Sequence, residues 1–190
     1  MPENDKHSKS KLFTTLHGVL IDIRGLGVLI VGPSGIGKSD CAIELISSKG
    51  CKLVSDDIVD VRTSDSGHLI GTAPDRTRHL MEVRGVGIVN IKDLYGADSV
   101  IIQKQIDMVV ELCLWDSNSD YDRLGIDDKS YKILETDVPY SLIPITPNRN
   151  IPTIIEVAVL NQLYKLSDSN NKDMILHQLE NVKAAAAGIK

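Results

Sequence analysis

Gly-Pro-Ser-Gly-Ile-Gly-Lys-Ser, residues 32–39, is the stretch that decides the fold. It matches G-x-x-x-x-G-K-[ST], the phosphate-binding P-loop, in which glycines let a phosphate approach bare backbone N–H groups. The apolar run before it, residues 27–31, is typical of a buried parallel strand. Apolar residues at helical spacing follow over residues 40–48. Strand, glycine loop and helix together predict an anion site at a helix N-terminus.

The motif also supplies the nucleotide-binding candidates. Lys38 can reach the β- and γ-phosphates, and the Ser39 hydroxyl is placed to ligate Mg²⁺. The alternative is a glycine-rich turn that binds nothing, and the flanking strand and helix argue against it. The predicted nucleotide-binding residues are Gly32, Pro33, Ser34, Gly35, Ile36, Gly37, Lys38 and Ser39.

Length and composition limit the possible classes. A chain of 190 residues, 42% apolar and 25% charged, is typical of one globular domain. A net charge of −5 argues against a general nucleic-acid binder. No apolar run reaches the length of a membrane span, and no signal-peptide pattern is present. The 3 cysteines lack metal-ligand spacing and fit reduced thiols, so we expect a cytoplasmic protein without a membrane or nucleic-acid partner.

Strands outnumber helices along the chain, which indicates an α/β fold with a mixed sheet and C-terminal helices. We expect a disordered arm over residues 1–13, a main domain over 14–166 and a partly helical tail over 167–190. Strands are predicted at 14–23, 27–31, 52–55, 59–62, 68–72 and 105–115, the last being the longest, with patchy strand character at 127–138. Helices are predicted at 40–48, 91–95, 154–166 and 174–187, a hairpin turn at 24–27 and a proline-interrupted loop at 143–150.

Asp56 and Asp57 follow the short strand at 52–55, one strand after the glycine loop. A carboxylate that orients a metal or accepts a proton is expected at this position. Paired carboxylates can divide the work: one orients the water shell of Mg²⁺, and the other takes a proton from an attacking hydroxyl. The alternative is a solvated turn, because aspartate is common in turns.

Other polar residues are ambiguous when each is taken alone. His17 begins a strand and is typical of a structural histidine. Glu82 and Arg84 flank a single residue, so we place both on one face of a strand, where an exposed ion pair is the plain alternative. Arg123 and Arg149 lie in predicted loops, where a surface salt bridge is the alternative.

Taken together and in order, several motifs resemble the catalytic domain of the bacterial HPr kinase/phosphorylase family. The resemblance covers roughly residues 16–164, and it includes the run 155–158, which is similar to the closing helix of that family. The motifs are His17-Gly18-Val19, residues 32–39, Asp56-Asp57, residues 82–88, residues 121–125 and Asn148-Arg149-Asn150.

The resemblance implies a serine kinase that uses ATP and Mg²⁺ and acts on HPr, the phosphocarrier protein of the sugar phosphotransferase system. It implies a reverse reaction in which inorganic phosphate attacks phosphoserine and yields pyrophosphate. It also implies a P-loop kinase fold akin to phosphoenolpyruvate carboxykinase and a homo-oligomer, namely a hexamer. Main-domain residues 14–166 would then form the catalytic domain.

Roles carry over to matching positions by the same resemblance. Asp57 is the implied proton acceptor from serine, and Asp56 its neighbour on the metal side. Ser39 and Glu82 are the implied Mg²⁺ ligands, and residues 83–90 are similar to a stretch tied to both reactions. The implied catalytic residues are His17, Lys38, Asp56, Asp57 and Arg123. A loop tied to dephosphorylation and to the partner would contain Pro144, Thr146, Asn148, Arg149 and Asn150.

The chain departs from the long members of that family in two respects. Few residues precede His17, which resembles the short proteobacterial form without the N-terminal domain. Pro33 and Asp40 stand where the long forms usually have aspartate and glutamate, so the sequence leaves the favoured direction of reaction open. Two other classes compete: a small-molecule P-loop kinase, and a non-enzymatic nucleotide switch, against which the missing Asn-Lys-x-Asp signature argues.

Overall fold

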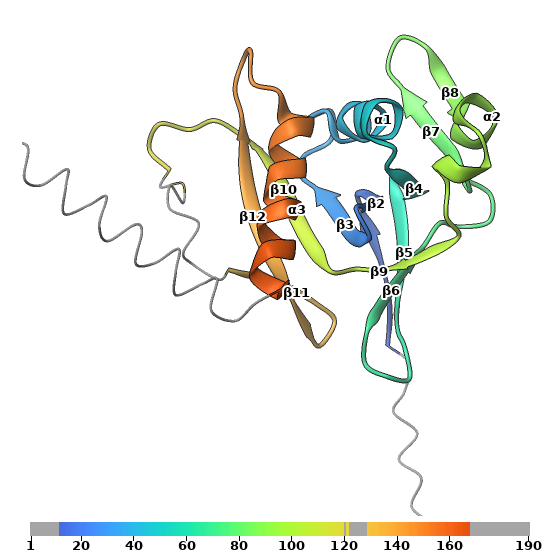
Figure 1. The fold of residues 1–190 in the computed structure, drawn as a ribbon, viewed down its shortest axis with the longest axis horizontal. Coiled ribbons are helices and arrows are strands. Elements are labelled where there is room, and N and C mark those ends of the chain that lie inside the picture. Colours follow the sequence, from blue (N-terminus) through green and yellow to red (C-terminus); the bar gives the residue numbers. More distant parts are fainter. Residues whose placement is uncertain (1–11, 120, 122–128, 168–190) are drawn as a thin grey trace, which may run out of the picture.

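The computed structural model describes residues 12–119, 121 and 129–167. These residues form three layers (Figure 1): helices, a mixed 6-stranded sheet, and a 4-stranded antiparallel sheet. Helices α1 (Lys38–Lys49) and α3 (Ile151–Ser167) cover one face of the mixed sheet. The antiparallel sheet covers its other face. The predicted α/β fold with a mixed sheet and a C-terminal helix is confirmed.

The mixed sheet has the order β11-β12-β10-β3-β2-β4. β10 runs parallel to both β3 and β12, whereas β2 is antiparallel to both of its neighbours. The predicted hairpin turn joins β2 to β3 through Arg24 and Gly25, both at positive φ. The strands are β2 (Val19–Ile23), β3 (Leu26–Val31), β4 (Lys52–Ser55), β10 (Met108–Leu114), β11 (Ser130–Ile133) and β12 (Thr136–Ile145).

The remaining strands form two smaller sheets. The antiparallel sheet has the order β1-β5-β6-β9, and β7 pairs with β8 in a separate hairpin that lies beside α1 (Figure 1). Helix α2 (Ile91–Tyr95), which was predicted at those residues, and a short 3₁₀ helix (Ala97–Ser99) follow β8. The strands are β1 (Phe13–His17), β5 (Ile58–Thr63), β6 (Leu69–Thr72), β7 (Leu80–Val83), β8 (Gly87–Asn90) and β9 (Gln103–Gln105).

The mixed sheet is buried on both faces, which explains its nearly continuous apolar strands. Successive side chains of a strand point to opposite faces. Along β2, Val19, Ile21 and Ile23 therefore pack under the helices, whereas Leu20 packs against the antiparallel sheet. Full burial of such a side chain contributes about 1.5–3 kcal/mol, so the two apolar layers hold β2, β3 and β10 rigidly in the centre.

Three strand predictions are wrong. Residues 14–23 form not one strand but two, β1 and β2, which separate at Gly18 and join different sheets. The predicted strand 105–115 is divided in the same way between β9 and β10. The longest strand is β12, which continues through residues 143–145, where we expected a loop. Among the described residues, only β10 pairs with that end of β12, because the β11 pairing reaches only Pro139, so Pro144 is tolerated as on an edge strand.

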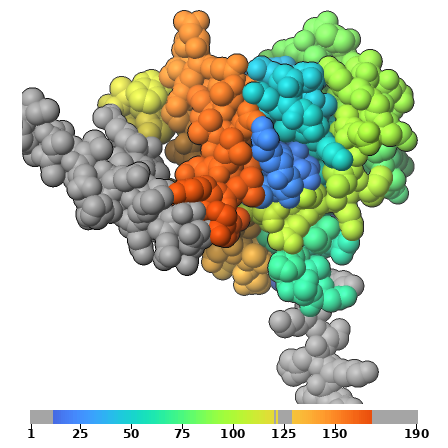
Figure 2. Space-filling model, viewed as in Figure 1, coloured from blue at the N-terminus to red at the C-terminus, as the bar shows by residue number. Residues whose placement is uncertain are grey.

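The two large helices lie side by side on one face of the molecule (Figure 2). Helix α3 begins before the predicted residue 154, because Asn150 Oδ1 accepts a hydrogen bond from the Thr153 N–H at 2.8 Å and caps its first turn. The Glu156 carboxylate is buried and binds Arg24 at 2.9 Å and Lys49 at 3.1 Å, and their hydrogen bonds lower its pKa. These contacts fix α3 to α1 and to the β2–β3 turn. The predicted helix 174–187 lies outside the described residues.

Candidate functional site

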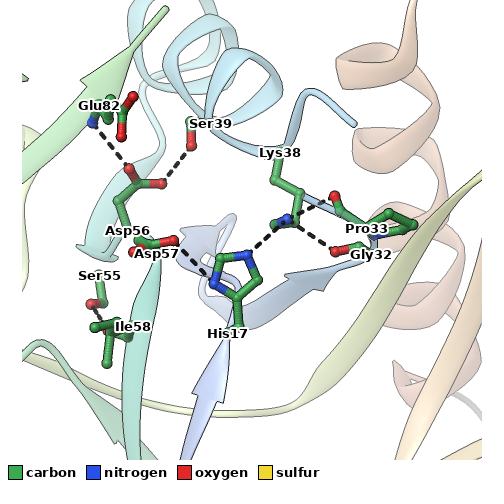
Figure 3. Close-up of polar contacts among 10 residues, drawn as sticks. All are labelled: His17, Gly32, Pro33, Lys38, Ser39, Ser55, Asp56, Asp57, Ile58 and Glu82. Atoms are coloured by element: carbon green, nitrogen blue, oxygen red, sulfur yellow. Dashed lines mark hydrogen bonds and ion pairs between the residues drawn. The ribbon is translucent and has the colours of Figure 1, made fainter. Parts of the chain in front are cut away.

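The strand order brings three separate segments together at one edge of the mixed sheet. The glycine loop (residues 32–39) follows the end of β3, and Asp56 follows the end of β4. Between these strands lies β2, which is antiparallel to both, so its beginning, just after His17, lies at the same edge. Figure 3 shows the resulting cluster of polar side chains.

The glycine loop passes close to the backbone of β10. Gly32 has a φ of 139°, and a Cβ there would lie 2.4 Å from the Leu112 carbonyl oxygen. Helix α1 then begins at Lys38 without a side-chain cap on its first N–H groups. Uncapped N–H groups at a helix N-terminus attract anions, because the helix dipole is positive there.

Lys38 is buried beneath this loop, with only 7% of its surface exposed. Its Nζ donates to the carbonyl oxygens of Gly32 at 3.0 Å and Pro33 at 3.1 Å, and lies 3.4 Å from His17 Nε2. Burial lowers the pKa of the ammonium, and the charges of Asp57 and Asp56 oppose that shift. The nearby carboxylates thus favour a charged lysine at the loop.

Asp56 is a buried carboxylate that joins the loop to another element. Its Oδ1 accepts from the Ser39 hydroxyl at 2.8 Å, and its Oδ2 accepts from the Glu82 backbone N–H at 3.2 Å. Burial raises the pKa of Asp56, and the hydrogen bonds from Ser39 and Glu82 oppose the shift. Asp56 therefore orients the serine hydroxyl and holds the β7–β8 hairpin against α1.

Asp57 points the other way, toward solvent and His17. Its Oδ1 lies 3.0 Å from His17 Nδ1, and the side chains of His17 and Asp57 are 52% and 66% exposed. Because Nδ1–H donates to the carboxylate, Nε2 of the neutral ring can accept from Lys38. The imidazole thus bridges the Asp57 carboxylate and the Lys38 ammonium (Figure 3).

These groups line a cleft of about 160 Å³ beneath the β7–β8 hairpin. Within the described ranges, no cluster of 3 or more His, Cys, Asp or Glu side chains is arranged as a metal site. Mg²⁺ is commonly held by one or two protein oxygens together with waters and substrate phosphates. The Ser39 hydroxyl and the Asp56 and Glu82 carboxylates in this cleft offer oxygens of that kind. The lining residues are His17, Val19, Ser34, Gly35, Gly37, Lys38, Ser39, Asp40, Asp56, Asp57, Glu82 and Arg84.

The sequence matches a known family over most of its length. The model of the HPr Serine kinase C-terminal domain matches residues 9–179. The chain belongs to this family. No helix among the described residues is long and apolar enough to cross a membrane.

Two named relatives and one solved structure are similar to this chain. The chain is 46% identical over 169 residues to the HPr kinase/phosphorylase of Bacillus licheniformis, covering 89% of this chain and 54% of the relative. It is 50% identical over 152 residues to that of Geobacter sulfurreducens, covering 80% and 47%. The chain thus spans about half the length of these relatives. The structure of the Hpr(Ser) kinase/phosphatase from Coxiella burnetii superimposes with a TM-score of 0.76 at 30% identity, covering 85% of this chain and 97% of that one.

The predicted catalytic and metal-binding residues that the structure describes all line the cleft. Lys38, His17 and Asp57 contact one another in series, and Asp56 contacts Ser39 and the Glu82 backbone N–H. Arg123 lies outside the described residues.

The predicted partner loop lies apart from these groups, at the β12–α3 connection. Arg149 Nη1 donates to the Pro144 carbonyl oxygen at 3.0 Å, and Asn150 Nδ2 donates to Glu44 Oε1 at 3.3 Å. Thr146 and Asn148 belong to the same connection, where the Arg149 N–H donates to the Thr146 carbonyl oxygen. None of these loop residues is among the residues that line the cleft.

Arg84 also lines the cleft, although the sequence predicted it only as a strand residue beside Glu82 and as part of the 83–90 stretch. We placed Glu82 and Arg84 on one strand face, but β7 ends at Val83 and Arg84 lies in the turn of the hairpin. Its guanidinium lies over the glycine loop, so that a Cβ on Gly35 would be 3.1 Å from Arg84 Nη2. The sequence signals for it were its place in residues 83–90 and the adjacent glycine, which permits a tight turn.

Proposed function

We propose that this chain is an ATP- and Mg²⁺-dependent protein serine kinase that phosphorylates the phosphocarrier protein HPr. One observation carries the proposal: the exposed Asp57 carboxylate lies 3.0 Å from His17, on the open side of the cleft that contains Lys38. Membership of the HPr Serine kinase C-terminal domain family supports HPr as the acceptor. A large acceptor needs an exposed base, and Asp57 is exposed.

The glycine loop acts as a P-loop in this proposal, on a fold akin to phosphoenolpyruvate carboxykinase. The first N–H groups of α1 bind the phosphates of ATP, and Lys38 contacts the β- and γ-phosphates. Lys38 is held at the loop by two backbone carbonyls, so its charge is preorganised where phosphate charge accumulates.

Ser39 and Glu82 would hold Mg²⁺ together with the phosphates. Asp56 orients the Ser39 hydroxyl through the 2.8 Å hydrogen bond and positions Glu82 through its backbone. When bound, the ion offsets the negative charge of the phosphates. Ionised Asp56 contacts Ser39 and the Glu82 backbone, and its negative charge strengthens the binding of a cation by the oxygens of Ser39 and Glu82.

Asp57 is the proton acceptor. A serine hydroxyl is a weak nucleophile, so a positioned carboxylate accelerates its attack. As the serine oxygen bonds to the γ-phosphorus, the bond from that phosphorus to the β-phosphate oxygen breaks, ADP leaves, and the serine proton passes to Asp57. His17 holds one carboxylate oxygen through Nδ1–H, which leaves the other oxygen to receive the proton.

The reverse reaction uses the same groups. An oxygen of inorganic phosphate attacks the phosphoserine phosphorus, Asp57 returns its proton to the departing serine oxygen, and pyrophosphate forms. We propose that Arg123 contributes positive charge in both directions, and that the loop containing Pro144, Thr146, Asn148, Arg149 and Asn150 serves dephosphorylation and partner contact. The working unit is proposed to be a cytoplasmic hexamer whose catalytic domain spans residues 14–166.

The proposal is tested with purified chain, Mg-ATP labelled in the γ-phosphate, and three acceptors: HPr, an unrelated serine-containing protein, and a mixture of nucleosides. We expect label on HPr serine alone. Label on the nucleosides with none on HPr would instead identify a small-molecule kinase. Incubating phospho-HPr with inorganic phosphate and no ATP then tests the reverse reaction, for which pyrophosphate release is the expected result.

A further inference from the structure

Arg84 lies where a second cation can reach the phosphates. It follows β7 in the turn of the β7–β8 hairpin and lines the same cleft as Lys38 and Asp57. Its guanidinium lies close to the glycine loop: an ideal Cβ on Gly35 would be 3.1 Å from Nη2 and 3.7 Å from Nη1. A residue larger than glycine at position 35 would therefore displace the arginine.

Arg84 is not paired with a carboxylate of the described residues. Asp40, Asp56, Asp57 and Glu82 line the same cleft, yet within the described ranges Arg84 forms no ion pair with any of them. Asp57 binds His17, and Asp56 binds Ser39 and the Glu82 N–H. An exposed guanidinium without a carboxylate partner, beside a loop of N–H donors, adds to an anion site, because its planar fork matches phosphate oxygens.

Lys38 and Arg84 approach the cleft from different elements. Lys38 belongs to α1 and is fixed by the carbonyls of Gly32 and Pro33. Arg84 belongs to the hairpin that Asp56 holds in place through Glu82. A phosphate group on the glycine loop would thus contact the lysine from the loop and the arginine from the hairpin.

We propose that Arg84 binds the terminal phosphoryl group of the nucleotide, the group that is transferred, and positions it for attack beside Asp57. This inference rests on the proposed kinase function. It assigns to Arg84 a contact that a diphosphate product lacks, so Arg84 distinguishes the triphosphate from the diphosphate. A guanidinium at this position also stabilises charge on the equatorial oxygens during transfer.

The test measures equilibrium binding of ADP and of a non-hydrolysable ATP analogue, both with Mg²⁺, to the full chain and to Arg84→Gln, Arg84→Lys and Arg76→Gln. Arg76 is an exposed arginine outside the cleft and serves as the matched control. We expect Arg84→Gln to bind the triphosphate about 10- to 100-fold more weakly, the range for hydrogen bonds to charged groups. Its affinity for ADP should change less than about threefold, and Arg84→Lys should fall between.

Three results would overturn the inference. Unchanged affinity for the triphosphate in Arg84→Gln would mean that the arginine does not touch it. If Arg84→Gln lost affinity equally for both nucleotides and melted at a lower temperature than Arg76→Gln, Arg84 would only support the glycine loop. Failure of the unmodified chain to bind either nucleotide would remove the proposed function itself, and this inference with it.

Discussion

The substitution Asp57→Asn removes the basicity of the Asp57 carboxylate but keeps the size and shape of the side chain. Asp57 has a φ of 67°, in the left-handed region, where asparagine is readily accommodated. The amide oxygen can still accept the hydrogen bond from His17 Nδ1–H, which is 3.0 Å long in the native chain. Because the side chain is 66% exposed, we expect a change in folding free energy of at most about 0.5 kcal/mol.

We therefore expect Asp57→Asn to lower the rate of phosphoryl transfer and not the folding stability. Removing a general base slows transfer by about 10²- to 10⁴-fold, which corresponds to about 3–5 kcal/mol in the activation free energy. Nucleotide binding should be retained or tightened, because the variant removes a negative charge that acts on the Lys38 ammonium. Single-turnover transfer to HPr and equilibrium binding of the ATP analogue measure the two quantities separately.

The matched control is Asp60→Asn. Asp60 lies on β5, the strand that follows Asp57, and its Oδ1 accepts from Thr15 Oγ1 at 3.0 Å on the antiparallel sheet. We expect transfer at the native rate in this variant. A transfer rate that falls less than tenfold in Asp57→Asn, or that falls equally in Asp60→Asn, would refute Asp57 as the proton acceptor.

Three further predictions concern the loop, the buried carboxylate and the thiols. Gly32→Ala places a Cβ 2.4 Å from the Leu112 carbonyl oxygen, so we expect a loss of about 1–3 kcal/mol in urea unfolding and weaker ATP binding; native stability would contradict the packing of the loop on β10. Asp56→Ala leaves the Ser39 hydroxyl and Glu82 N–H without their acceptor, which should cost about 1–3 kcal/mol in the same assay, and a stabilised variant would show that the carboxylate is not needed there. Burial raises the pKa of Cys41 from 9.0 to about 12 and that of Cys51 to about 11. Above pH 9 the unfolded thiols ionise while the folded ones keep their protons, so stability should fall as the pH rises, by up to about 1.4 kcal/mol per pH unit for each thiol. Cys41→Ala should make this slope shallower, and an unchanged slope would contradict the shift.

Local signals in the sequence were sufficient for the centre of the fold and for much of the cleft. The apolar run 27–31 and the glycine loop identified β3 and the start of α1, and Gly50 ends α1 in the left-handed conformation that is typical of glycine at a helix C-terminus. Asp56 and Asp57 were recognised because they directly follow a short apolar strand. Each of these signals lies within a few neighbouring residues, where backbone geometry and burial act directly.

Features that depend on distant pairing could not be predicted. Residues 14–23 form two strands because β1 pairs with β5 whereas β2 pairs with β3. The apolar pattern is continuous over these residues, so it did not predict where one strand ends and the next begins. Pro144 lies in β12 because the neighbouring β11 is short, which is a property of another strand. Arg84 reaches Gly35 because the hairpin packs beside α1 and is tied to Asp56 through the Glu82 N–H, whereas sequence spacing alone suggested an ion pair with Glu82.

The most direct test of the central claim is a crystal structure of this chain with Mg²⁺ and a non-hydrolysable ATP analogue. We predict that the triphosphate lies on the glycine loop, with the ion bound by Ser39 and Glu82 and the terminal phosphate between Lys38 and Asp57. A triphosphate bound elsewhere, or one whose terminal phosphate points away from Asp57, would contradict the assignment of this cleft as the site of phosphoryl transfer.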